Sequence, residues 1–240
     1  MKKFDIIILH GWGLSGRTFI PLRKELLKKG YQVYVPDLPG FGKSDIPKYP
    51  LTLRDYAKFL YEYLDIHHIK APILIGHSFG GRVALMFNQL YPKSVRALIL
   101  SGTPGYTPIP KKKLEFFIFL AKAGGMIFQI PPFSLFQNYV RRWYYYAVGA
   151  KDFFRAEGSM RQTFKNIVRD SLVNAMESVT VPTLLVWGQL DIIVPTAIAV
   201  RMHTKMKTSE LIIIPGSDHG VLYKQPEMFV SAVSKFLHSL

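Results

Sequence analysis

Short apolar runs rich in Val and Ile alternate along the chain with longer stretches of helical periodicity, and this alternation limits the folds open to it. The runs are bounded by Gly and Pro, which is typical of buried strands in βαβ units. Six strands are predicted, at Phe4–Leu9, Gln32–Val35, Pro72–Ile75, Val95–Leu100, Thr183–Trp187 and Glu210–Ile214. The pattern therefore predicts an α/β fold with a mostly parallel sheet flanked by helices.

Two of the predicted helices have recognisable starts. After Pro50, Thr52 and Asp55 have the spacing of a capping box, and an apolar stripe follows at helical period. That stripe consists of Tyr56, Phe59, Leu60, Tyr63 and Leu64. The last helix is predicted to begin near Pro226, a residue suited to a first helical turn, and to run to the C-terminus. Its expected inward side chains are Phe229, Val233, Phe236 and Leu237.

The strand–helix alternation breaks between about residues 104 and 178. This segment is rich in aromatic residues and its Gly and Pro residues indicate helices joined by turns. An insertion between two strands of an open α/β sheet lies over the carboxyl ends of the strands, where ligands bind in such folds. We therefore expect residues 1–103 and 179–240 to form the core, and residues 104–178 to form a helical lid.

The first of two glycine motifs, Gly11-Trp12-Gly13-Leu14-Ser15-Gly16, matches the G-x-G-x-x-G fingerprint of dinucleotide-binding proteins. It follows a predicted strand, and Asp37 lies about 20 residues further on, where such proteins carry a ribose-binding acid. However, Trp12 places a large ring in a loop that must approach a pyrophosphate closely, and Asp37 begins a turn-rich segment instead of ending a strand. An NAD-dependent oxidoreductase is therefore the weaker interpretation.

The second motif, Gly76-His77-Ser78-Phe79-Gly80-Gly81, lies between a predicted strand and a predicted helix. G-x-S-x-G in that context is a nucleophile elbow. The serine of an elbow has a strained backbone at a sharp turn, so the glycines two residues to either side must lack side chains for the chain to pass closely. The Ser78 hydroxyl would then lie at a helix N-terminus, where negative charge is favoured.

A serine hydroxyl needs a base to take its proton, and the base needs a third group to hold its tautomer. Of the seven histidines, His219 has the best setting, because it lies in a glycine-containing loop directly after a predicted strand. Asp191 follows another predicted strand in the same way. The order Ser78, Asp191, His219 is that of α/β-hydrolase triads. Asp218 is the weaker candidate acid, because adjacent residues in one turn rarely face each other well.

Together these motifs resemble the α/β-hydrolase superfamily, most closely its small lidded serine hydrolases, which include carboxylesterases, meta-cleavage-product hydrolases, lactonases and perhydrolase-like enzymes. The matching stretches are His10 to Gly13, Asp37 to Ser44, the elbow, Gly188 to Pro195 and Gly216 to His219. Related dehalogenases and epoxide hydrolases have Asp at the nucleophile position, so Ser78 argues against both.

The resemblance implies roles for further residues. The backbone N–H groups of Trp12 and Phe79 would form the oxyanion hole, which leaves both side chains free to line the substrate pocket. His10 would orient the first glycine loop. Because aromatic lid residues are expected to contact substrate, Trp143 is a third predicted substrate-binding residue.

These features predict a serine hydrolase that cleaves carboxylic esters of apolar acyl or aryl compounds through an acyl-enzyme intermediate. The same triad would also serve a C–C bond hydrolase, a lactonase or a thioesterase, because specificity depends on pocket shape. A ligand-binding receptor that retains the triad is a non-enzymatic alternative. The expected partner is a small-molecule ester, and nothing in the sequence sets an oligomeric state.

Composition narrows the remaining function classes. The chain has no cysteine, which excludes disulfides, Cys-based zinc sites and iron–sulfur clusters. His67, His68 and His203 have no partner at ligand spacing, so no metal is predicted, and the triad needs no cofactor. The net charge of +15 is spread over many positions and no nucleic-acid module is recognisable, so a solvated basic surface is expected.

Two apolar segments bear on membranes and targeting. The run 116–136 contains Lys122, two glycines and two prolines, so a buried helical hairpin is expected, with membrane or lipid contact through the lid as the alternative. The N-terminal apolar run is interrupted by Asp5, is too short for a secretory leader and precedes no cleavage site. We therefore expect a cytoplasmic protein.

Overall fold

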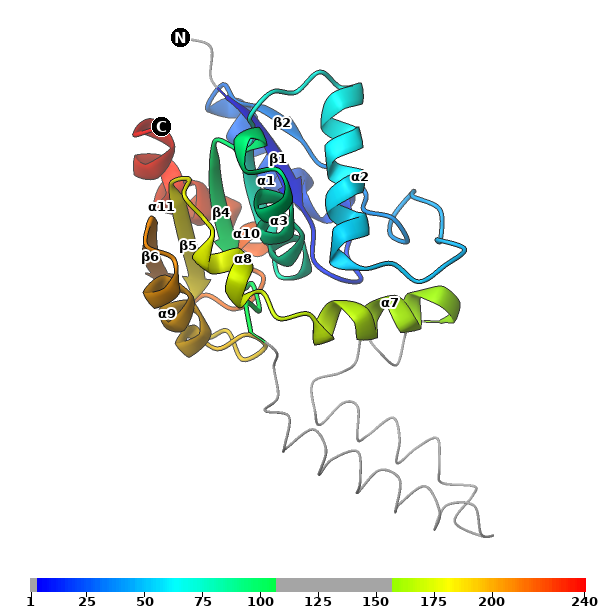
Figure 1. Cartoon of the computed structure of the whole chain (residues 1–240). Helices are drawn as coiled ribbons and strands as arrows, with labels where there is room; N and C mark the ends of the chain where they lie inside the picture. The colour runs from blue at the N-terminus through cyan, green and yellow to red at the C-terminus, as the bar shows by residue number, and fades with distance from the viewer. Residues whose placement is uncertain (1–3, 107–156) are drawn as a thin grey trace, which may run out of the picture.

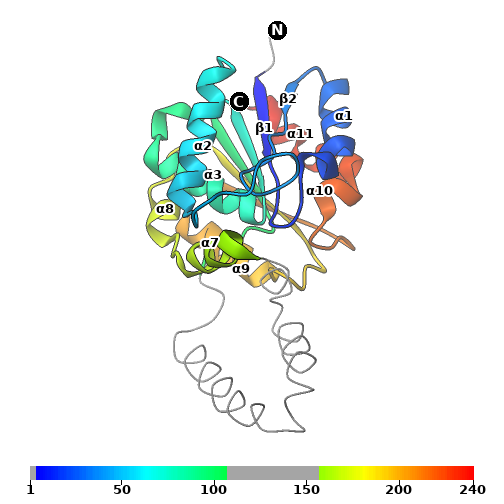
Figure 2. The ribbon, with the colours of Figure 1, turned by 90° about the vertical axis from the view of Figure 1, so that its right-hand side faces the viewer.

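The computed structural model describes residues 4–106 and 157–240, which form a central sheet with helices on both faces (Figures 1 and 2). The sheet of the described residues has six parallel strands in the order β2-β1-β3-β4-β5-β6. The strands are β1 (Asp5–Leu9), β2 (Gln32–Tyr34), β3 (Ile73–His77), β4 (Ala97–Ser101), β5 (Thr183–Gly188) and β6 (Ser209–Ile214). The predicted parallel α/β sheet is confirmed.

Apolar side chains from both faces of the sheet build two separate cores. Along β1, Ile6 and Ile8 belong to one core, and Ile7 and Leu9 belong to the other. All four are fully buried. A strand buried on both faces needs a continuous apolar run in place of an alternating one, because every position faces a layer of helices. This is why β1, β3, β4 and β5 contain unbroken runs of Ile, Leu and Val.

Each face of the sheet is covered by helices from both the N-terminal and the C-terminal half of the chain. One face carries η1 (Gly16–Phe19), α1 (Ile20–Lys28), α10 (Val221–Lys224) and α11 (Pro226–His238). The other carries α2 (Leu53–Ile66), α3 (Phe79–Leu90), α8 (Val173–Glu177) and α9 (Thr196–Lys205), with η2 (Pro92–Ser94) after α3. In the view of Figure 2, the two groups of helices lie on either side of the sheet.

Both predicted helix starts are confirmed. The Thr52 side chain accepts a hydrogen bond from the Asp55 N–H, and the Asp55 carboxylate accepts one from the Thr52 N–H. This reciprocal capping box begins α2. The last helix starts at Pro226, and its four expected inward residues are all buried.

Residues 104–106 and 157–178 of the predicted insertion are described, and the second of these stretches contains α7 (Gly158–Arg169) and α8. In Figure 1, α7 lies along the edge of the sheet where the strands end. Its Thr163 hydroxyl accepts a hydrogen bond from Leu51 N–H at 2.8 Å, and its Asn166 amide donates to Leu51 O at 3.1 Å. Ser159 donates to Pro47 O at 2.5 Å. Helix α7 is therefore fixed to the loop that precedes α2.

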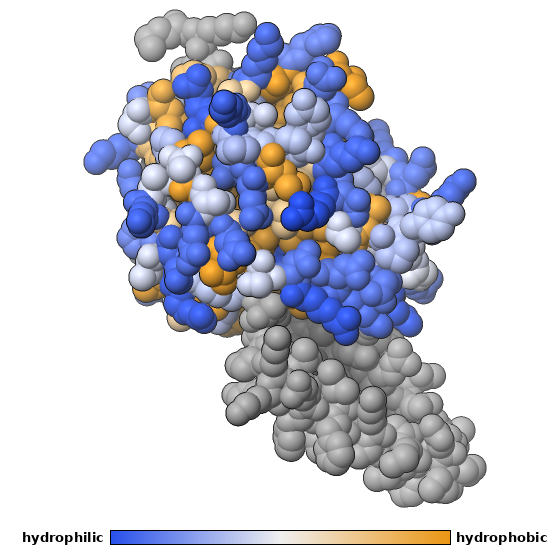
Figure 3. Space-filling view, in the orientation of Figure 1, coloured by the Kyte–Doolittle hydropathy of each residue, from blue (hydrophilic) through white to orange (hydrophobic). Residues whose placement is uncertain are grey.

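The outer surface around α7 is hydrophilic. Hydrophilic residues dominate the face shown in Figure 3, including the surface where α7 lies. On that helix Gln162, Lys165 and Arg169 are exposed, whereas Met160, Thr163 and Ile167 are buried. Within the ranges 4–106 and 157–240, no helix is long and apolar enough to cross a membrane. The apolar run 116–136 lies outside those ranges.

Candidate active site

The sequence G-x-S-x-G forms a sharp turn between β3 and α3. Ser78 caps α3 with φ 51° and ψ −113°, a left-handed conformation that is rare for a residue with a side chain. A Cβ on Gly76 would lie 2.5 Å from the Gly81 Cα, and one on Gly80 would overlap the main chain of Leu9. The predicted reason for both glycines, close passage of the backbone, is confirmed.

Asp191 and His219 lie in the loops that follow β5 and β6, and their side chains form a hydrogen bond. His219 Nδ1 lies 2.7 Å from Asp191 Oδ2. A carboxylate only accepts hydrogen bonds, so Nδ1 carries the proton and Nε2 is left with a free lone pair. The other Asp191 oxygen accepts from the N–H groups of Ile193 at 2.9 Å and Val194 at 2.8 Å, which fixes the carboxylate. The Asp191 side chain is 1% exposed and that of His219 is 13% exposed.

The carboxyl end of β4 connects Ser78 with this pair. Ser101 O accepts a hydrogen bond from the Ser78 N–H at 2.9 Å. The next residue, Gly102, has φ +55°, and a Cβ there would lie 2.6 Å from His219 Cε1 and 3.3 Å from Asp191 Oδ2. The three predicted triad residues are therefore arranged around the same two residues of the β4 end.

The first glycine loop is held by His10, which is fully buried. Its Nε2 accepts from the Leu38 N–H at 2.9 Å, so Nδ1 carries the proton and donates to Gly11 O at 2.8 Å. Burial lowers the pKa of His10, against the opposing effects of the Gly11 hydrogen bond and the Asp37 charge. A neutral imidazole thus connects the start of this loop to the segment after β2, which agrees with the orienting role predicted for His10.

The two predicted oxyanion donors lie at the same edge of the sheet, where the strands have their carboxyl ends. Trp12 follows the end of β1, and Phe79 is the first residue of α3, whose N–H has no intrahelical acceptor. Among the described residues, no hydrogen-bond acceptor is found for the backbone N–H of either one. Both groups are therefore available to an external acceptor.

Four aromatic side chains gather beside the elbow, and we call them the aromatic cluster: Trp12, Phe41, Phe79 and Phe164. The Trp12 ring contacts the other three edge-on, at centroid distances of 4.8 Å, 5.5 Å and 5.0 Å respectively. Phe164 comes from α7, so the predicted insertion contributes to the cluster. Trp143, the third predicted substrate-binding residue, lies outside the described residues.

The carboxylates of Asp37 and Asp218 have partners outside the candidate triad. Asp37 accepts from Gly16 N–H at 2.6 Å and from Lys43 N–H at 2.9 Å, and so connects two loops. Burial acts to raise its pKa, but these hydrogen bonds together with the electrostatic effects of His10 and Lys43 outweigh burial, and the pKa is lowered. Asp218 accepts from Gly220 N–H at 2.8 Å and binds the Lys224 ammonium. These contacts favour neither a ribose-binding Asp37 nor an acid role for Asp218.

His77, inside the elbow, is fully buried against the loop that carries His219. Its Nε2 donates to His219 O at 2.9 Å, and the two imidazole rings lie 4.7 Å apart. Burial lowers the pKa of His77 to about 3, and the neighbouring His219 contributes. His77 is therefore a neutral donor to the main chain of His219.

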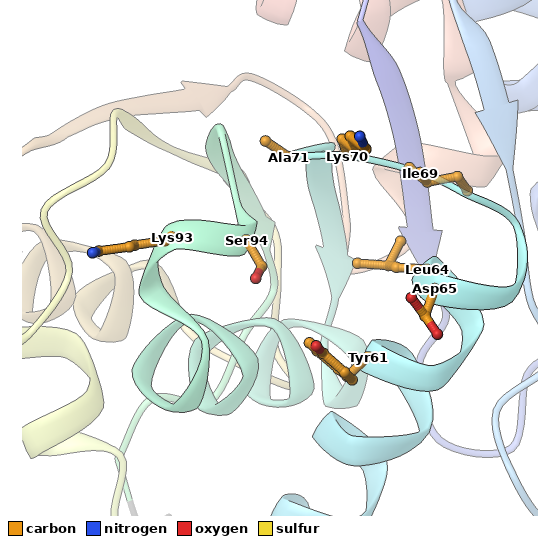
Figure 4. A pocket seen from close by; sticks show the side chains of 8 residues that line it. All are labelled: Tyr61, Leu64, Asp65, Ile69, Lys70, Ala71, Lys93 and Ser94. Carbon is orange, nitrogen blue, oxygen red and sulfur yellow. The ribbon is translucent and has the colours of Figure 1, made fainter.

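A cavity of about 290 Å³ lies at the opposite edge of the sheet (Figure 4). It is lined by residues that precede β3 and β4, among them Tyr61, Lys70 and Ser94, and the Lys93 amine points away from the others. Because the candidate triad follows the carboxyl ends of the strands, this cavity is separate from it. Nowhere in the described ranges do three or more His, Asp or Glu side chains gather as a metal site would require.

The comparisons with known proteins agree with this fold. The chain belongs to the alpha/beta hydrolase fold family, whose model matches residues 6–135. A second family model, described as TAP-like protein, matches residues 162–240.

Individual relatives and structures include proteins with esterase names. The chain is 25% identical over 259 residues to a pimeloyl-[acyl-carrier protein] methyl ester esterase of Wigglesworthia glossinidia brevipalpis, covering 97% of this chain and 93% of the relative. The structure of the esterase EaEST from Exiguobacterium antarcticum is similar with a TM-score of 0.75 and 22% identity, covering 99% of this chain and 93% of that one. A variant of the meta-cleavage product hydrolase CumD gives a TM-score of 0.69 and 22% identity, with 99% and 92% covered.

Proposed function

We propose that this protein is a serine hydrolase that cleaves carboxylic esters of apolar acyl or aryl compounds through an acyl-enzyme intermediate. The observation that carries the proposal is the 2.7 Å hydrogen bond between His219 Nδ1 and Asp191 Oδ2. It occurs together with a serine, Ser78, that has a positive φ at a sharp strand–helix turn. A buried carboxylate fixed by two N–H groups is the group that a catalytic imidazole needs, because it sets the tautomer and stabilises the imidazolium.

Each triad residue has one role in the proposed reaction. Ser78 Oγ attacks the ester carbonyl carbon while His219 Nε2 takes its proton. His219 then gives that proton to the oxygen of the leaving group. The ester C–O bond breaks, the alcohol departs, and the acyl group remains bound to Ser78. Water attacks this ester with the same base, giving the carboxylic acid and free Ser78. Asp191 stays ionised throughout.

The oxyanion of each tetrahedral intermediate would bind the N–H groups of Trp12 and Phe79. Their lack of acceptors in the described residues supports this role. Removing a single donor of this kind typically costs ~2.7–4 kcal/mol of transition-state stabilisation. Because both donors are main-chain groups, a side-chain substitution at Trp12 would test the pocket and leave the N–H in place.

The aromatic cluster supports the proposed substrate class. Three of its members come from the sheet edge and the fourth from α7, so an acyl or aryl group next to Ser78 would contact apolar rings. Small-molecule pockets are mostly apolar with few polar groups, which fits an ester without charge near the carbonyl. In this proposal residues 1–103 and 179–240 supply the catalytic core, and residues 104–178 supply the lid.

Activity-based labelling combined with ester turnover tests the proposal. Wild-type protein should react covalently with a fluorophosphonate at Ser78 and hydrolyse p-nitrophenyl esters. Ser78→Ala should abolish labelling and lower turnover by several orders of magnitude. Ser231→Ala is the matched control, because Ser231 is exposed on α11. Substantial ester hydrolysis by folded Ser78→Ala protein would refute the role of Ser78.

A substrate panel distinguishes the alternatives that share the triad. Wild type and Ser78→Ala should be compared on short and long p-nitrophenyl esters, a lactone, a thioester and a vinylogous diketone. The proposal requires the aryl or apolar esters to have the highest kcat/KM. Preferential turnover of the diketone would replace it with C–C bond hydrolysis.

A further inference from the structure

Arg82 is a buried cation that none of the proposed catalytic steps uses. It lies on α3, one helical turn after Ser78, in a stretch where residues 79–88 are all buried. The whole residue is 3% exposed. No described carboxylate forms an ion pair with it. A charge buried in this way is costly unless hydrogen bonds replace its hydration.

The hydrogen bonds of Arg82 go to main-chain carbonyls in two distant segments. Its Nη1 donates to Pro104 O, at the point where the chain leaves β4. Its Nη2 donates to Ile167 O at 2.7 Å and to Asp170 O at 2.5 Å, at the end of α7. The last carbonyls of a helix lack intrahelical partners, and a cation there is favoured by the helix dipole. Arg82 therefore caps α7 and holds it against α3.

The helix held by Arg82 also carries one member of the aromatic cluster. Phe164 lies on α7 one turn before Ile167, and its ring is 5.0 Å from that of Trp12. At the start of the same helix, Met160 packs against Gly40, so the helix is held at both ends. A change at the Arg82 end would alter how closely Phe164 approaches the rest of the aromatic cluster.

We infer that Arg82 is a positioning residue for substrate selectivity: by hydrogen bonding the end of α7, it holds Phe164 in the aromatic cluster beside Ser78. The inference rests on the proposed function, because selectivity is measured as ester hydrolysis. It adds a residue whose side chain hydrogen-bonds no triad residue and that acts through Phe164. Arg82 thereby couples the helix that follows Ser78 to α7, which carries Phe164.

A double-mutant cycle tests this coupling. The variants are Arg82→Lys, Phe164→Ala and the two combined, with Arg82→Met as a second substitution that removes the donors altogether. The readout is the ratio of kcat/KM for p-nitrophenyl phenylacetate to that for p-nitrophenyl acetate. Arg169→Lys is the control, because Arg169 is exposed in the last turn of the same helix.

We expect Arg82→Lys and Phe164→Ala each to change the ratio about tenfold, the lower range of single-contact discrimination in an apolar pocket. The combined variant should match Phe164→Ala, because once the ring is absent its position no longer matters. Arg169→Lys should keep the wild-type ratio. Fluorophosphonate labelling of Ser78 should persist in every variant.

Three results would overturn the inference. Arg82→Lys could fold and keep the wild-type ratio, the two changes could multiply independently, or both Arg82 variants could fail to fold, which would make Arg82 a residue of the core alone. A wild-type protein that neither labels at Ser78 nor hydrolyses esters would instead refute the proposed function. The two failures are distinguished by the wild-type measurements.

Discussion

Replacing Gly102 with alanine tests whether the position of His219 controls turnover. A Cβ on this residue would lie 2.6 Å from His219 Cε1, 2.7 Å from Nδ1 and 3.3 Å from Asp191 Oδ2. Ordinary contact begins at 3.4 Å, so the imidazole must move by about 3.4 − 2.6 = 0.8 Å. The added methyl group therefore displaces the proposed base without changing any triad residue.

The expected magnitude follows from this displacement. A misplacement of ~1 Å in a catalytic arrangement costs on the order of 10²-fold in rate, or about 2.7 kcal/mol in the activation free energy. The left-handed φ of +55° adds a separate cost, because alanine in this conformation is strained by about 1–2 kcal/mol. We expect kcat for p-nitrophenyl acetate to fall about 100-fold and the free energy of unfolding to fall by at least the strain.

Gly158→Ala separates the two effects. Gly158 has nearly the same φ, +53°, but no atom of the described residues lies within 4 Å of its ideal Cβ. This control should lose a similar free energy of unfolding to backbone strain and keep its kcat. The assays are urea unfolding, steady-state hydrolysis and the rate of fluorophosphonate labelling. If both alanine variants retain wild-type kcat, an 0.8 Å shift of His219 is harmless and the reasoning fails.

Three further predictions concern the acid, a buried histidine and a helix cap. Asp191→Asn should lower kcat on the order of 10⁴-fold by favouring the wrong His219 tautomer, whereas Asp218→Asn should not; equal losses would reopen the choice of acid. His77 has a folded pKa of about 3 against its ordinary value of 6.5, so the unfolded chain binds the extra proton and stability should be lost as pH falls from 6.5 toward 3. Between pH 6.5 and 4.5 the free energy of unfolding of wild type, measured with urea, should fall by about 1.4 kcal/mol per pH unit more than that of His77→Gln. An equal fall in the two proteins would contradict this. Thr52→Ala should lower the free energy of unfolding by about 1 kcal/mol with kcat unchanged, and an unchanged unfolding midpoint would show that the capping box contributes nothing.

The strands could be predicted from the sequence, and the carboxyl ends of β1 and β6 with them, but the carboxyl ends of the other four strands differ from the prediction by one or two residues. The third strand was predicted to end at Ile75, and β3 continues to His77 because Gly76 pairs with Leu100 and His77 pairs with Ser101. Glycine and histidine carry little strand signal of their own. Their place in the sheet is decided by a neighbouring strand that lies about 25 residues away, which is information that local pattern does not contain.

The candidate triad could be predicted because each residue lies in a short motif with its own physical reason. Ser78 needs flanking glycines, and Asp191 and His219 need loops after strands. Arg82 and Gly102 were missed for the opposite reason. The acceptors of Arg82 are main-chain carbonyls, which every residue has, so no residue type marks them. The available signal was an arginine in a helix whose neighbouring positions are apolar, a pattern that calls for distant acceptors.

Helix α3 shows why these missed residues matter to the elbow. A non-glycine residue held at positive φ costs of order 1–3 kcal/mol and persists only where the surrounding structure fixes it. For Ser78 that structure is a helix buried along residues 79–88, a hydrogen bond to Ser101 O, and the attachment of Arg82 to two further segments. The strain at Ser78 is thus balanced by contacts outside the G-x-S-x-G motif. The motif specifies the turn, and the residues packed around α3 keep it in place.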